Sequence, residues 1–148
     1  MEMWELVARE RIRETIARYA HCADTGRFAD LVELFTDDGV LEIDGRLPLT
    51  GRSAIAGFLG STKASLASTL GRPFIRHHVS SLTIEVDTPE TARAASYFLA
   101  ITERGPDHWG RYRDQLRAVG DRWLLEHRRV RPDGHSERSW RASRGDTP

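Results

Sequence analysis

The sequence has one cysteine, no net charge and no long hydrophobic run, and each of these absences excludes a class of protein. Cys22 alone cannot form an internal disulfide, which fits a protein of the reducing cytoplasm. The 22 basic and 22 acidic side chains leave a formal net charge of +0, which favours neither nucleic acid nor an anionic membrane as a partner. No apolar run approaches the ~20 residues of a membrane span. We therefore expect a cytoplasmic protein with no nucleic-acid or membrane partner.

Sequence motifs for bound metals and phosphates are also missing. His21, His108, His127 and His135 lack the spacing that is typical of metal ligands. The chain contains no glycine-rich phosphate loop and no nucleophile elbow. We expect chemistry without a metal or an organic cofactor.

The front half of the chain has the periodicity of helices. With 148 residues, the chain is long enough for one domain with its own core. Its apolar spacing and turn residues predict, in order, a helix from Met3 to Ala23, a short helix from Phe28, a turn at 36–39, a strand that enters a hairpin at Gly45, and a helix around Phe58. Residues 60–72 are small and polar, which predicts a mobile connection at the rim of a pocket.

The back half has the pattern of strands. Four stretches separated by short turns are expected to be strands, at residues 74–86, 91–103, 108–119 and 123–131. Short connections between consecutive strands predict an antiparallel meander, and helices followed by strands indicate an α+β fold. We predict one domain over residues 1–131 and a disordered tail over residues 132–148, apart from a docking of Trp140.

The most informative stretch runs from residue 74 to residue 87 and contains His77 and His78. Because successive side chains of a strand point to opposite faces, the two histidines cannot enter one cavity or chelate one metal together. Strict alternation would place His77 opposite the apolar side chains of the second half, such as Ile84. Either a bulge near residues 80 and 81 or a second covered face would accommodate both.

The chain resembles the SnoaL-like branch of the nuclear transport factor 2 superfamily. The order of the predicted elements agrees, and six local patterns between Ile12 and Val130 carry the resemblance: Tyr19-x-x-x-x-Asp24-x-x-x-Phe28, Leu34-Phe35-Thr36-Asp37-Asp38-Gly39, Gly51-Arg52-x-x-Ile55-x-x-Phe58, Arg76-His77-x-Val79-x-x-x-x-Ile84-x-Val86-Asp87, Gly110-Arg111-Tyr112-x-Asp114, and Asp121-x-Trp123-x-x-x-x-Arg128. The resemblance implies a cone-shaped, strongly curved antiparallel sheet, wrapped by the N-terminal helices around a deep pocket. It also implies a homodimer or homotrimer.

Within the superfamily, the chain is most similar to scytalone dehydratase-like and hexachlorocyclohexane dehydrochlorinase-like members. This resemblance implies a catalytic pair of His77 on the first long strand and Asp24 at the end of the first helix. The dehydratases carry a second active-site histidine on the strand that here includes residues 110–114, where this sequence has none. That difference argues against the water-binding arrangement of scytalone dehydratase.

An imidazole held by a buried carboxylate is a good general base near neutral pH. We hypothesise that His77 takes a proton from carbon or oxygen, that Asp24 orients its ring, and that Tyr112 or a water assists a leaving oxygen by hydrogen bonding. The alternatives are that Asp24 caps the second helix and that His77 is a structural strand histidine.

Further side chains are candidates for contact with a substrate. Strand alternation places Tyr112 and Asp114 on one face and the neighbouring arginines on the other, and only one of Arg128 and Arg129 can face inward. The substrate-binding candidates are Tyr19, Phe98, Trp109, Asp114 and Arg128, several of which would also suit a wall or core.

These observations predict a lyase, dehydratase or polyketide-type cyclase of secondary metabolism that acts on a hydrophobic, polycyclic or aromatic small molecule by His-Asp general base catalysis. The alternatives are a non-catalytic ligand-binding or accessory subunit that uses the same pocket, and a ketosteroid-isomerase-like isomerase.

Overall fold

The computed structural model describes residues 1–70 and 74–140, and the side chains of these residues except 66–70. The elements are, in order, α1 (Met3–Thr25), α2 (Phe28–Val32), β1 (Phe35–Ile43), β2 (Leu49–Thr50), α3 (Arg52–Leu70), β3 (Ile75–Val86), β4 (Thr91–Thr102), β5 (Gly105–Val119) and β6 (Arg122–His135). The predicted α+β class is confirmed. No helix in the described part of the chain is both long and apolar enough to cross a membrane.

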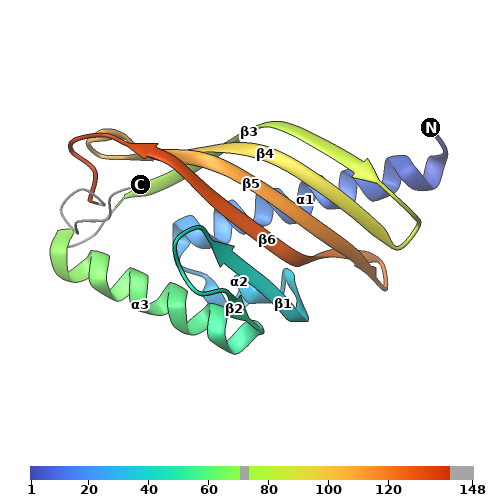
Figure 1. Ribbon diagram of the computed structural model, residues 1–148, viewed down its shortest axis with the longest axis horizontal. Helices are drawn as coiled ribbons and strands as arrows, with labels where there is room; N and C mark the ends of the chain where they lie inside the picture. Colours follow the sequence, from blue (N-terminus) through green and yellow to red (C-terminus); the bar gives the residue numbers. More distant parts are fainter. Residues whose placement is uncertain (71–73, 141–148) are drawn as a thin grey trace.

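The strands form one six-stranded sheet in the order β2-β1-β6-β5-β4-β3 (Figure 1). Strands β3 to β6 make the predicted antiparallel meander. Strand β1 departs from the prediction of an all-antiparallel sheet, because it pairs with β6 in parallel. No short turn joins β1 to β6, so the connection does not impose an antiparallel direction.

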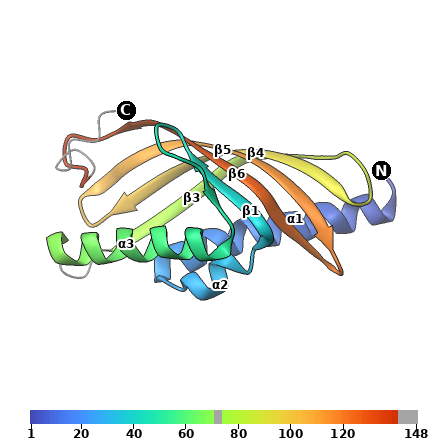
Figure 2. The ribbon, with the colours of Figure 1, turned by 60° about the horizontal axis from the view of Figure 1, so that its bottom comes forward.

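The helices lie on one side of the curved sheet, which arches over α1 and α3 (Figure 2). Helix α1 turns one apolar stripe toward the sheet, and its buried residues recur at helical spacing: Ala8, Ile12, Thr15, Ile16, Tyr19, Ala20 and Cys22. The core that they form with the inner face of the sheet includes Phe35 and Leu125, both fully buried. The curvature and the helices together leave one inner face on which polar groups can be held away from water.

A β-bulge in β3 explains how His77 and Ile84 share the inner face. The register between β3 and β4 shifts between Ser80 and Thr83, where Ser81 has a φ of 52°. On one side of the shift His77 pairs with Ala100, and on the other Ile84 pairs with Ala94. Both alanines are buried, so the extra residue of β3 reverses the alternation between the two halves of the strand. The first of the two predicted alternatives is therefore confirmed.

Three local predictions differ from the structure. The expected turn at 36–39 lies within β1, where the pairing with β6 is irregular between Phe35 and Val40. The expected mobile connection is helical up to Leu70, because the alanines and leucines of this segment are good helix formers, and residues 71–73 lie outside the described residues. The last predicted strand, expected to end at residue 131, continues as β6 to His135, while residues 141–148 lie outside the described residues.

Candidate active site

Asp24 and His77 meet between the last turn of α1 and the first half of β3. The Asp24 Oδ1 atom lies 2.5 Å from His77 Nδ1, and Asp24 Oδ2 accepts the main-chain N–H of His77 at 2.9 Å. The side chains are 7% and 17% exposed. The α2 N-cap position, Arg27, makes no side-chain cap, so the carboxylate at the end of α1 serves the histidine rather than the following helix. Two bonds from one carboxylate fix both the backbone and the ring of His77.

The orientation of His77 determines what its ring can do. Asp24 accepts a hydrogen bond from Nδ1 of His77, which places the proton of a neutral ring on that nitrogen. The other nitrogen, Nε2, then keeps a free lone pair on the side of the ring away from Asp24. An imidazole held in this way is arranged to accept a proton at Nε2.

A second histidine, His108 of β5, faces His77. The two ring centroids are 6.0 Å apart with an interplanar angle of 80°. His108 Nδ1 lies 2.7 Å from Asp107 Oδ2, and both residues are buried. The expectation that β5 offers no second histidine is therefore corrected, since this residue precedes the motif at Gly110. The sequence signal was an aspartate followed directly by a histidine at the start of a predicted strand.

Phe98 joins the histidines to the interior aromatic residues. Its ring centroid lies 6.2 Å from His77 and 6.0 Å from His108, and the ring stacks on Tyr112 at 4.7 Å. Gly110 makes room for this ring, because a Cβ there would come within 2.9 Å of Phe98 and 2.3 Å of a backbone oxygen. Burial raises the pKa of the Tyr112 phenol above its ordinary value, so this hydroxyl stays protonated.

A buried ion pair lies further along the inner face. Arg128 donates from Nε and Nη2 to the two oxygens of Asp114, both at 2.8 Å, and neither side chain is exposed. The guanidinium is held between the rings of Tyr19, at 4.1 Å, and Tyr112, at 4.2 Å. Burial alone would lower the pKa of Arg128, but the charge and hydrogen bonds of Asp114 hold it above its ordinary value. Arg128 is thus the arginine that faces inward.

One donor of this pair has no partner. Arg128 Nη1 is buried and makes no hydrogen bond within the described residues. Its neighbour Arg129 instead lies on the outer face, where it donates to Asp44 at 2.8 Å. The Nη1 group could donate a hydrogen bond to a ligand oxygen.

Trp109 does not join the other predicted residues. It lies between the inward-facing His108 and Gly110 and pairs with Leu99, and it is 37% exposed with its ring against Gly134. The structure thus brings together seven of the eight predicted site residues and leaves this one on the outer face.

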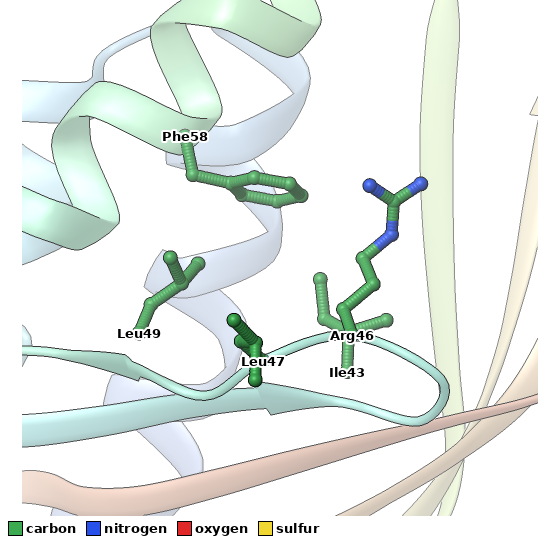
Figure 3. Close-up of a pocket in the computed structure, with 5 residues that line it drawn as sticks. All are labelled: Ile43, Arg46, Leu47, Leu49 and Phe58. Carbon is green, nitrogen blue, oxygen red and sulfur yellow. The ribbon is translucent and has the colours of Figure 1, made fainter.

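A small pocket opens where the β1–β2 turn faces α3 (Figure 3). Its volume is about 150 Å³, and it is lined by Ile43, Arg46, Leu47, Leu49 and Phe58. Ile43 pairs with Val130, which in turn pairs with Tyr112, so the pocket continues the inner row of the sheet. Within the described residues, no group of three or more histidine, cysteine or acidic side chains is arranged to hold a metal ion.

Comparison with known proteins gives one family and a common fold. The family model described as a SnoaL-like domain matches residues 4–129. A candidate scytalone dehydratase from Novosphingobium aromaticivorans is similar in structure, with 25% identity, a TM-score of 0.78, and coverage of 92% of this chain and 91% of that one. An NTF2-like protein with a cystatin-like fold from the same organism shows 27% identity and a TM-score of 0.74, with coverage of 93% and 86%.

A third structure shares the fold alone. It is the β subunit of a candidate aromatic-ring-hydroxylating dioxygenase from Novosphingobium aromaticivorans, with 20% identity, a TM-score of 0.70, and coverage of 89% and 93%. No curated protein matches the sequence.

Proposed function

The chain belongs to the family of SnoaL-like domains, and from this premise we propose that it is a lyase or cyclase that uses His77 as a general base on a hydrophobic small molecule. The predicted membership of this branch of the superfamily is confirmed by the family match and by the structural neighbours. The observation that carries the proposal is the contact of 2.5 Å between His77 Nδ1 and Asp24 Oδ1.

The proton chemistry follows from the two imidazoles. In an elimination of water, His77 Nε2 takes a proton from the carbon next to the one that bears the hydroxyl. The C–H electron pair becomes the new double bond, and the C–O pair leaves with the oxygen. Protonated His108 gives that oxygen the proton with which it departs as water. In an aldol-type ring closure, the same base forms an enolate that attacks a carbonyl, and the same acid protonates the new alkoxide.

The spacing of the rings supports acid and base roles on one substrate. With centroids 6.0 Å apart, the rings can reach a hydrogen and a leaving oxygen on neighbouring carbons. The aromatic side chains of Phe98 and Tyr112 lie beside them and favour a hydrophobic, aromatic or polycyclic substrate. Arg128 Nη1 would donate a hydrogen bond to an oxygen of that substrate.

Two other functions remain candidates on specific observations. If the abstracted proton returned to another carbon of the substrate, His77 and His108 would catalyse an isomerisation. The fold shared with a dioxygenase β subunit supports a non-catalytic accessory role, in which the inner face holds a ligand without turnover.

A pair of neighbouring substitutions tests the base. His77→Gln and His78→Gln change the same residue type on the same strand, but His77 meets Asp24 and His78 faces solvent. With a panel of hydroxylated dihydronaphthalene and tetralone substrates, we expect His77→Gln to lose two to four orders of magnitude in rate, roughly what general base catalysis contributes. His78→Gln should retain activity. Equal activity of the two folded variants would remove His77 from the mechanism, and tight binding of the panel without turnover would favour the accessory role.

A further inference from the structure

The end of β6 and the residues after it fold back over the start of β5. His135 pairs with His108, and the chain then turns at residues 136–140. The Ser136 N–H donates to the main-chain oxygen of Asp107 at 2.8 Å, and the Ser139 N–H donates to Ser136 O at 3.1 Å. This segment, residues 136–140, is therefore anchored beside the second histidine by its backbone.

Side-chain and backbone donors of the segment converge on one carboxylate. Ser139 Oγ donates to Asp107 Oδ2 at 2.8 Å, and the Trp140 N–H donates to Oδ1 at 3.4 Å. Asp107 Oδ2 is also the atom that lies 2.7 Å from His108 Nδ1. The carboxylate is only 2% exposed, so these donors replace the water that such a charge requires.

Trp140 also contacts the histidine directly. Its ring meets the ring of His108 edge to face, with centroids 5.8 Å apart and an interplanar angle of 88°. The other rings around this imidazole are those of His77 and Phe98, both at 6.0 Å. Within the described residues, segment 136–140 thus supplies one of the rings that surround the second histidine.

We propose that Ser139 and Trp140 are positioning residues of the site, which act through Asp107 to fix the tautomer and the direction of the His108 ring. Asp107, held by Ser139 and Trp140, accepts the Nδ1–H of His108, which directs Nε2 of the ring away from this carboxylate. With segment 136–140 in place, Asp107 and His108 form a carboxylate–histidine pair like that of Asp24 and His77. The catalytic part of this inference rests on the proposed function, whereas the positioning part does not.

The protonation of Asp107 agrees with this role. Burial by itself raises the pKa of this carboxyl, but the hydrogen bonds from His108 and Ser139 outweigh burial and hold the pKa below its ordinary value. Asp107 is thus an anion near neutral pH and a constant acceptor for the imidazole. Asp107 contacts His108, and the other side of the His108 ring faces His77, which in turn contacts Asp24.

The test compares two serines of the same segment in the full chain. Ser139→Ala removes the hydroxyl that donates to Asp107, whereas Ser136→Ala removes a hydroxyl that makes no hydrogen bond within the described residues. Nitrogen-15 NMR of the histidine side chains reports the tautomer of His108 and the exchange rate of its Nδ1 proton. At a pH at which the His108 ring is neutral, we expect one tautomer in the native protein and in Ser136→Ala. In Ser139→Ala we expect mixed tautomers and a roughly tenfold faster exchange, and Ser139→Thr should restore the native signal.

Two results would overturn the proposal. One is an unchanged His108 tautomer and exchange rate in folded Ser139→Ala. The other is an unchanged tautomer in Asp107→Asn, which tests the same chain of contacts one residue closer to the ring. Neither readout needs a substrate, so the positioning role and the proposed function fail separately: active His77→Gln would reject the proposed function, while the His108 signal would still decide the role of Ser139.

Discussion

Asp24 holds His77 at two points, and this double contact is what distinguishes a positioned base from a merely buried histidine. One oxygen accepts the backbone N–H and the other contacts the ring. The backbone contact fixes where the ring starts, and the ring contact fixes where it points. The proposed base is thus positioned by a residue 53 positions away in the chain.

We expect Asp24→Asn to keep the fold and to lose most of the activity. An amide can donate to Nδ1 and so favour the wrong tautomer, which costs on the order of 10⁴ in kcat in hydrolases that use the same carboxylate–histidine contact. Steady-state kinetics measures the loss. Asp30→Asn, at an exposed aspartate of α2, is the matched control and should retain native kcat. Native kcat in Asp24→Asn would show that this carboxylate does not orient the base.

Asp114 and Arg128 form a buried pair whose separation should be costly. Asp114→Asn leaves the Arg128 charge uncompensated in a site with no exposure, which destabilises by about 3–5 kcal/mol. Asp133→Asn removes one partner of an exposed pair with Arg111 and should cost about 0–1 kcal/mol. Urea unfolding measures both variants. Equal, small losses would mean that Arg128 is satisfied without Asp114.

The free energy of unfolding at acidic pH should depend on the ionisation of Asp107. Its pKa is lowered in the folded protein, so its ionised form adds stability that is fully present above the ordinary value of 3.8 and lost as the pH falls through the lowered pKa. The difference in unfolding free energy between the native protein and Asp107→Asn should therefore shrink only below about pH 4. A difference that stays constant down to pH 2 would contradict this.

At the residue scale, alternation predicted more than motif spacing did. The inward direction of Tyr112 and Asp114 followed from the two-residue period of a strand, and burial along β5 agrees. The same period could not identify His108, because Asp107 and His108 are adjacent and both are buried. Near these residues, the register of β5 shifts against both neighbouring strands, β4 and β6. Irregular backbone is where sequence periodicity carries no information.

At the element scale, the bulge in β3 decides which face His77 occupies. Ser81 holds a left-handed φ of 52°, which costs an ordinary residue about 1–2 kcal/mol. A sequence can indicate that such a bulge is needed. Here strict alternation would have placed His77 and Ile84 on opposite faces of the strand. The sequence alone cannot choose between a bulge and a second covered face, because that choice depends on what packs against the strand.

We expect Ser81→Val to destabilise the protein by more than about 1 kcal/mol, since a β-branched side chain tolerates a left-handed φ poorly. Ser81→Gly should be neutral or slightly stabilising, because glycine adopts this conformation without strain. Thermal unfolding measures both variants, and Thr83→Val, at an exposed position of the same strand, is the control. Equal stability of the valine and glycine variants at position 81 would show that the bulge is not strained.

Helix α3 is longer than the composition of its second half indicates. Its second half is small and polar by composition, which suggested a connection, yet the helix continues to Leu70. Helix propensity summed over the alanines and leucines outweighs the serines and threonines of this segment. Helix α3 also lines the pocket beside the β1–β2 turn, through Phe58.

At the scale of the whole molecule, the order of elements was enough for the α+β class, because helices followed by a meander leave few ways to bury the apolar faces. The family came from the resemblance that the six local patterns carry. The parallel pairing of β1 with β6 was not predictable in the same way. It joins strands from opposite ends of the chain, and no local turn specifies it.

The outer face of the sheet leads to a prediction about assembly. Tyr97 is 53% exposed there, beside Trp109 and a set of arginine–carboxylate pairs. We expect light scattering to give a homodimer or homotrimer rather than the 16.8 kDa of one chain, and Tyr97→Arg to lower that mass. Leu47→Arg, in the β1–β2 turn, should leave the mass unchanged. A native mass of one chain would contradict the expected assembly.

If Asp24 leaves His77 Nε2 free to accept a proton, nitrogen-15 NMR of the His77 side chain will show it. With the ring neutral, we expect a proton on Nδ1 and none on Nε2 in the native protein, and loss of this single tautomer in Asp24→Asn. A native ring protonated on Nε2 would have no lone pair for the substrate, and His77 could then not be the base.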